Sequence, residues 1–121
     1  KKPLATMKDI TERTFQFSLE ILRLFRKINR EYSADTNVLS KQLLRSATSI
    51  GANVEEAQSG QSRADFISKM SIALKEARET HYWLRLLAAG ELIKPDELRG
   101  LVKEADELKR ILGAIIVSSK K

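Results

Sequence analysis

The chain contains no cysteine and a single histidine among its 121 residues. Without cysteine there is no disulfide, no thiolate metal site and no thiol nucleophile, and one histidine does not complete a zinc site. No apolar run approaches the roughly 20 residues of a membrane-spanning helix, and nothing resembles a secretory signal. We therefore expect a cytoplasmic protein with no membrane segment, no metal and no cofactor.

Helix-breaking and aromatic residues are also scarce. The chain has two prolines, five glycines and only 6% aromatic residues, and Leu, Ile, Ala, Lys, Arg and Glu dominate what remains. That balance favours helices over strands. The length fits one domain, residues 1–121, with one hydrophobic core.

Apolar residues recur with helical spacing in four segments. We expect helices over residues 6–30, from about 36 to 58, 62–90 and 95–117, with turns at Ser59–Gly60–Gln61 and around residues 91–94. The first stripe consists of Ile10, Thr14, Phe17, Ile21, Leu24 and Ile28, widened by Leu22 and Phe25. Four amphipathic helices with short connections predict an all-α, antiparallel, up-down-up-down four-helix bundle.

Particular residues mark the expected helix ends. Thr6 resembles the first residue of a capping box, and Thr36 or Asn37 is a plausible cap for the second helix. Ser62 caps the third helix, and Pro95 suits the first position of the fourth. Gly60 suits a left-handed residue after a helix end. The last four residues, 118–121, are expected to form a loose basic tail.

The second helix carries short side chains beside its apolar stripe. Gly51 lies in mid-helix, which indicates close contact with a neighbouring helix rather than a pocket. On the side away from the stripe lie Arg45 and Glu56, which are too far apart in sequence to pair along one helix. They belong either to a contact with another helix or subunit, or to a solvated edge.

The third helix has apolar residues on two sides. Its core face includes Phe66, Met70, Ala73, Ala77 and Leu84. On the other side, a second set mixes apolar and acidic residues and holds the only tryptophan: Ile72, Glu76, Glu79, Trp83 and Leu86. We interpret this second set as a contact between subunits, because a simple bundle helix keeps its outer side polar. The alternative is that Trp83 covers a neighbouring helix of its own chain.

Positive charge is the main guide to a ligand. The net charge is +6, which favours acidic partners such as nucleic acid. Arg23, Arg26, Lys27 and Arg30 lie opposite the apolar stripe of the first helix. They form either a solvated face or a phosphate-binding strip, to which Lys109, Arg110, Lys120 and Lys121 are possible additions. No aromatic residue interleaves with them, so base stacking is not expected.

No catalytic set emerges from the sequence. His81 falls on the core face of its helix, where a lone histidine is usually structural. Glu76 and Glu79 are spaced like paired acid–base carboxylates, but such pairs are frequent on helices. His81 lies about 160° around the helix from Glu79, so the two do not converge. We expect no enzymatic activity.

Two sequence blocks carry a family resemblance. The segments QLLRSATSIGANVEEAQ and SRADFISKMSIALKEARETHYWL are similar to the four-helix-bundle proteins encoded in intervening sequences of bacterial 23S ribosomal RNA genes. The resemblance covers roughly residues 9–117. It implies an antiparallel bundle that assembles as a ring-shaped homopentamer, in a family without an assigned enzymatic activity. A similar fold serves as the accessory protein of diversity-generating retroelements, where a basic pentamer engages a reverse transcriptase and nucleic acid.

Two functional hypotheses follow. The first is a non-enzymatic oligomeric bundle that binds structured RNA or DNA through its basic surface. The alternative is a scaffold or adaptor for a protein partner, for example a reverse transcriptase, with no direct nucleic-acid role. The sequence identifies neither the partner nor the number of subunits.

Overall fold

Four long helices make up almost the whole chain. The computed structural model describes the backbone of residues 2–31 and 33–121, and the side chains of residues 9–28, 30 and 33–121. The helices are α1 (Lys2–Glu31), α2 (Ala34–Gln58), α3 (Arg63–Ala89) and α4 (Pro95–Ser119). Within those described residues there is no strand. The predicted all-α class is confirmed.

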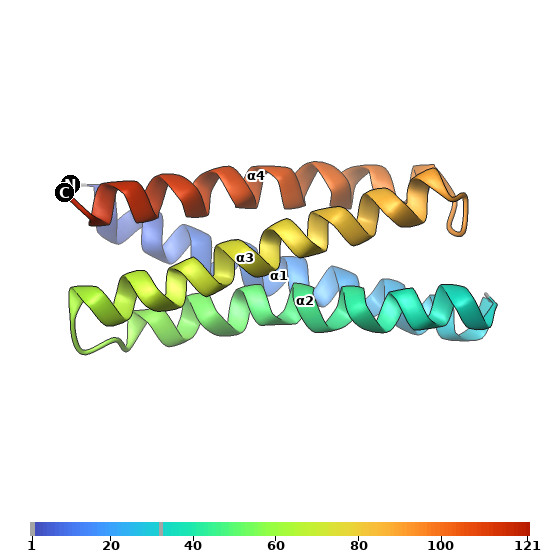
Figure 1. Ribbon diagram of the computed structural model, residues 1–121, viewed down its shortest axis with the longest axis horizontal. Coiled ribbons are helices and arrows are strands. Elements are labelled where there is room, and N and C mark those ends of the chain that lie inside the picture. The colour runs from blue at the N-terminus through green and yellow to red at the C-terminus, as the bar shows by residue number, and fades with distance from the viewer. Residues whose placement is uncertain (1, 32) are drawn as a thin grey trace.

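Consecutive helices run antiparallel and lie side by side, as the predicted bundle requires. Both ends of the chain and the α2–α3 turn lie at one end of the bundle, and the other two connections lie at the opposite end (Figure 1). Side-chain ion pairs join α1 to α4. Arg13 contacts Glu104 at 2.6 Å, and Lys27 contacts Glu97 at 3.0 Å.

The core is built from the predicted apolar stripes. All six residues of the α1 stripe, from Ile10 to Ile28, are buried. Two corrections apply. Leu22 does not widen the α1 core stripe, because its side chain is 41% exposed. On α3 the buried set extends beyond the predicted apolar residues to two polar ones, Glu76 and Thr80.

Two of the predicted helix starts are right and two are wrong. Ser62 Oγ accepts the Asp65 backbone N–H at 3.1 Å, and Pro95 begins α4. Thr6 is no cap, because α1 begins four residues earlier at Lys2. Thr36 and Asn37 lie inside α2, which begins after Ser33. The N-terminus of α2 is closed instead by the Asp35 carboxylate, which accepts the Thr36 N–H at 3.0 Å and the Ser33 hydroxyl.

The α2–α3 turn does not use a left-handed glycine. None of the described glycines has a positive φ, so the expectation for Gly60 is wrong, and the left-handed residue is Glu91 after α3 (φ 55°). A side chain at Gly60 would instead meet the Ala57 carbonyl oxygen at 3.1 Å. The tail is also shorter than expected, because α4 continues to Ser119.

Gly51 allows α1 and α2 to approach closely, as predicted. A Cβ atom at this position would lie 3.3 Å from the Thr14 carbonyl oxygen and 3.3 Å from Ser18 Oγ. The Ser18 hydroxyl donates to the Ala47 carbonyl oxygen at 3.4 Å across the same contact. The short side chains of α2 therefore serve helix packing.

Candidate functional site

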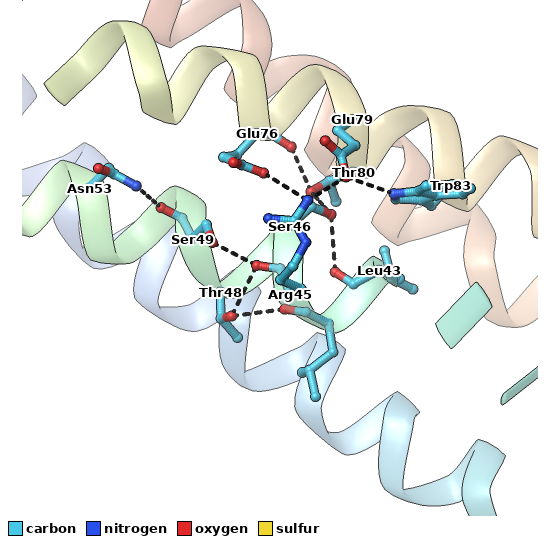
Figure 2. Close-up of polar contacts among 11 residues, drawn as sticks. Leu43, Arg45, Ser46, Thr48, Ser49, Asn53, Glu76, Glu79, Thr80 and Trp83 are labelled. Atoms are coloured by element: carbon cyan, nitrogen blue, oxygen red, sulfur yellow. Dashed lines mark hydrogen bonds and ion pairs between the residues drawn. The ribbon is translucent and has the colours of Figure 1, made fainter. Parts of the chain in front are cut away.

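The contact between α2 and α3 is centred on two buried hydroxyl groups. Thr80 Oγ1 lies 2.8 Å from Ser46 Oγ, and it lies 2.8 Å from the Glu76 carbonyl oxygen one turn earlier. Ser46 Oγ also lies 3.2 Å from the Leu43 carbonyl oxygen. Both hydroxyls thus have partners, which offsets the cost of burying them. This pairing fixes the register of α2 against α3 (Figure 2).

Directly outside that centre, Arg45 of α2 reaches two carboxylates of α3. Its Nη2 atom lies 2.5 Å from Glu79 Oε2 and 3.6 Å from Glu76 Oε1. Trp83 Nε1 donates to the same Glu79 oxygen at 3.2 Å. Four of the seven residues predicted for a subunit contact, Arg45, Glu76, Glu79 and Trp83, therefore form one cluster (Figure 2).

The ion pair perturbs the acidity of both partners. Burial alone would raise the pKa of the Glu79 carboxyl, but hydrogen bonds from Trp83 and Arg45 outweigh burial and lower this pKa. The hydrogen bond to Glu79, supported by the nearby charge of Glu76, raises the pKa of the Arg45 guanidinium. Both groups are therefore charged across the physiological range.

Glu76 differs from the other members of this cluster because one of its carboxylate oxygens has no hydrogen bond among the described residues. Its side chain is buried, with only 8% of the residue exposed, and its Oε1 atom has no hydrogen-bond partner among the described residues. The Arg45 guanidinium at 3.6 Å is too distant for a hydrogen bond. A buried carboxylate oxygen without a hydrogen bond is costly, and the nearby charge of Arg45 offsets part of that cost.

The apolar members of the predicted contact remain on the surface. Ile72 is 39% exposed and Leu86 is 38% exposed. Trp83 is half-buried against the core of its own chain and meets Tyr82 edge-on, with 5.3 Å between ring centroids. Glu56 is exposed and does not join the Arg45 cluster. The structure thus places Trp83 at the α2–α3 edge, where it both covers its own chain and borders the surface.

Two exposed apolar residues on this side of the bundle were not predicted from the sequence. Tyr82 is 50% exposed and follows the cluster on α3. Val38 is 61% exposed and lies two turns before Arg45 on α2. The antiparallel register that pairs Arg45 with Glu79 brings Val38 toward the part of α3 around Leu86. We call the surface formed by Val38, Arg45, Ile72, Glu76, Glu79 and Leu86 the α2–α3 face.

The predicted basic strip on α1 separates into two parts. Arg23, Arg26 and Arg30 are exposed and form no ion pair with the described residues. Lys27 is turned toward α4, where its ammonium lies 3.0 Å from Glu97 Oε1. The four cations that the sequence offered as additions to this strip also differ in whether they form ion pairs. Lys109 and Arg110 both pair with Asp106, whereas Lys120 is exposed at the end of the chain with Lys121.

His81 is partly buried and contacts a lysine of α4. Its Nδ1 atom lies 3.2 Å from the Lys109 ammonium, which donates to it when Nδ1 is unprotonated. Burial and the nearby charges of Lys109 and Arg85 lower the pKa of the imidazole, so it is neutral at physiological pH. It borders an open groove between α3 and α4, whereas Glu79 faces α2. The described His, Asp and Glu side chains form no group that could hold a metal ion.

None of the described helices is both long and apolar enough to span a membrane. The profile of the 23S rRNA-intervening sequence protein family matches residues 7–114. The chain belongs to this family. A solved structure of a protein of unknown function from the S23 ribosomal protein family of Bacteroides thetaiotaomicron is similar, with 43% identity and a TM-score of 0.82. That similarity covers 88% of this chain and 97% of the other.

Among curated proteins, no sequence matches the chain significantly. Neither the family description nor that of the solved relative names a catalytic activity. The family assignment therefore supports the bundle fold but does not identify a ligand.

Proposed function

We propose that this member of the intervening-sequence family is a non-enzymatic, self-associating bundle that binds structured RNA or DNA through arginines of α1. The observation that carries the proposal is the contrast among cations. Arg13, Lys27, Arg45, Arg99 and Arg110 are all committed to carboxylates of their own chain. Arg63, Arg78 and Arg85 also make no such pairs among the described residues, but they are spread along α3, whereas the three unpaired arginines of α1 lie within one short stretch: Arg23, Arg26 and Arg30.

Uncommitted guanidinium groups suit phosphate binding for a physical reason. A cation that already pairs with a carboxylate must give up that pair before it binds phosphate, whereas an exposed unpaired arginine gives up only water and counterions. The spacing of the three arginines, by three and four residues, keeps them along one side of the helix. With few aromatic groups beside them, they would read backbone charge and shape rather than base sequence.

Self-association would multiply this strip. The α2–α3 face supports such contacts, because it combines exposed apolar side chains with a buried carboxylate oxygen that lacks a donor. Several copies of a modest strip bind one nucleic acid more tightly than a single copy does. The resemblance to pentameric bundles gives five as the expected number of copies.

Binding of a stem-loop RNA across a series of salt concentrations tests the proposal. The double variant Arg23→Gln, Arg30→Gln should weaken binding at low salt. It should also flatten the dependence of log K on log salt by about 0.7 to 0.9 per arginine that contacts phosphate. The matched control Arg63→Gln, Arg78→Gln removes the same charge from exposed positions of α3. It should retain most of the wild-type affinity and slope.

Equal losses in the two double variants would show that only net charge matters and would remove the strip as a site. No binding of the wild type at low salt would overturn the nucleic-acid proposal. In that case, capture of a protein partner from native lysate that survives nuclease treatment would favour the alternative, a scaffold for another protein.

A further inference from the structure

An open groove follows the line where α3 and α4 pack against each other (Figure 1). Its apolar lining consists of Ala88 on α3 and of Pro95, Leu98 and Val102 on α4. The groove has a volume of about 550 Å³ and extends along α4 as far as Asp106. From Pro95 to Asp106 the chain makes about three helical turns, which span roughly 16 Å. The outside of the bundle therefore carries an elongated apolar surface that no helix of its own chain fills.

Cations surround this apolar lining. Arg99 and Lys103 line the groove from α4 and lie one turn apart. Lys103 forms no ion pair with the described residues, and the Lys109 ammonium lies 3.2 Å from Nδ1 of His81, which also lines the groove. On α3, Arg85 is exposed and its charge acts on the same imidazole. Both helices thus contribute positive charge to the rim.

The carboxylates near the groove leave most of this charge in place. Among the described residues that line the groove, only Asp106 is acidic, and it lies 3.5 Å from the Lys109 ammonium and 2.9 Å from the Arg110 guanidinium. Asp96 pairs with Arg99 at 2.7 Å, but both side chains are more than 70% exposed, so water weakens that pair. The rim therefore carries a net positive charge.

The groove on the other side of α4 has the opposite charge. It lies between α1 and α4, and four of its seven lining residues are acidic while none is basic. The four are Glu20, Asp96, Glu97 and Glu104. Because α4 separates a basic groove from an acidic one, an acidic ligand is attracted to the α3–α4 side and repelled from the α1–α4 side.

We infer that the α3–α4 groove binds an acidic amphipathic helix of a partner protein. Apolar side chains on one face of that helix cover Ala88 and Val102, and its carboxylates pair with Arg99 and Lys103 at the rim. His81 adds a neutral donor. Since Lys109 donates to Nδ1, the uncharged ring carries its proton on Nε2 and donates from that atom. A helix of about eleven residues has the same length as the groove.

Nucleic acid suits this groove less well. Phosphates would contact the cations of the rim but would leave the apolar lining exposed to water. Among the described residues that line the groove there is no Phe, Tyr or Trp on which a base could stack. An acidic amphipathic helix uses both the apolar lining and the charged rim. The groove is also separate from Arg23 and Arg30 of α1, so such binding requires neither nucleic acid nor a second copy of the chain.

Fluorescence anisotropy of a labelled synthetic peptide, titrated with the full chain at low salt, tests the inference. The probe is a helix of about fourteen residues, or four turns, with leucines along one face and glutamates elsewhere. A second peptide has the same composition with its leucines distributed around the helix. The first peptide should bind about tenfold more tightly than the second, because only the first presents an apolar face to the groove.

Charge reversal at the rim provides the matched variants. Arg99→Glu, Lys103→Glu should weaken binding of the first peptide about tenfold or more, since its carboxylates would then meet like charge. The control Lys41→Glu, Arg63→Glu makes the same charge change at exposed positions of α2 and α3 outside the groove and should lose much less. NMR of the labelled protein should show that the first peptide shifts signals of Ala88, Val102 and His81. Signals of Leu24, in the α1–α4 groove, should stay in place.

No binding of the first peptide to the wild type would overturn the inference, as would equal affinity for the two peptides. Equal losses in the two double variants would show that net charge alone attracts the peptide and would remove the groove as a site. Loss of stem-loop RNA binding in Arg99→Glu, Lys103→Glu, with peptide binding unchanged, would assign the rim to nucleic acid instead. If the peptide binds only after copies of the chain dissociate in light scattering, a second copy occupies the groove and the inference is wrong. The variant Arg23→Gln, Arg30→Gln should bind the peptide as the wild type does, so failure of the nucleic-acid proposal leaves this result unaffected.

Discussion

Arg45 of α2 and Glu79 of α3 form an ion pair in which Nη2 and Oε2 lie 2.5 Å apart. The pair stands on the outer side of the buried Ser46–Thr80 contact and shares its carboxylate with the Trp83 indole. Because neighbouring Glu76 is nearly buried and keeps one oxygen without a donor, the cluster is only partly satisfied within one chain. That incomplete satisfaction connects the packing of the bundle to the proposal that copies associate.

Replacement of Glu79 by Gln should make stability less dependent on pH in the acid range. Since the folded state lowers the pKa of the Glu79 carboxyl, its contribution is present above the unfolded pKa of about 4.3 and is lost as the pH falls through the folded pKa. Urea unfolding at neutral pH and at a series of acid pH values measures this. The wild type and the variant should differ most near neutrality and converge in acid. Glu55→Gln, at an exposed position of α2, is the control, and an equal effect there would contradict the assignment.

His81 should titrate below its ordinary pKa of about 6.5, as burial and the Lys109 and Arg85 charges require. Since the unfolded chain takes up this proton first, stability should fall as the pH drops below that value, and His81→Gln should flatten the fall. NMR titration of the imidazole in the wild type and in Lys109→Met measures the pKa directly. It should rise in the variant but stay below the ordinary value, because burial persists. An unchanged pKa would show that the 3.2 Å contact with Lys109 is absent in solution.

Glycine-to-alanine substitutions should separate helix propensity from helix packing. Gly100 and Gly113 lie inside α4, and a Cβ atom at either position would meet nothing within 4 Å. Alanine there should stabilise the fold by about 0.5 to 1 kcal/mol each. Alanine at Gly51 should gain less or destabilise, because its methyl group would press on the Thr14 carbonyl oxygen. Chemical unfolding measures all three, and an equal gain at Gly51 would contradict the close α1–α2 approach.

Periodicity predicted the helices and most of the core, because spacing by threes and fours is a property of the sequence itself. The helix ends were harder to predict from the sequence. Between Ser33 and Asn37 several residues can cap a helix, and the choice depends on the Asp35 carboxylate closing back on the Thr36 N–H. Gly113 shows a similar limit, since only the packed structure reveals that no neighbour approaches it.

The candidate site was predicted in outline rather than in detail. The sequence placed Glu76 on an outer side of α3, but its side chain is buried at the boundary with α2. At such a boundary, a small difference in angular position around the helix decides whether a side chain is exposed or buried. Lys27 was grouped with the arginines of α1, and only the packing of α4 reveals its pairing with Glu97. Leu22 was assigned to the core because its azimuth alone did not reveal which side of α1 the other helices leave uncovered.

Sedimentation velocity of the full chain at micromolar concentrations tests whether copies of the chain associate. We predict a species whose mass is a multiple of the 13.7 kDa chain. The double variant Ile72→Lys, Leu86→Lys should reduce that species to single chains without loss of helicity. A wild type that sediments only as a 13.7 kDa monomer would contradict the proposed self-association.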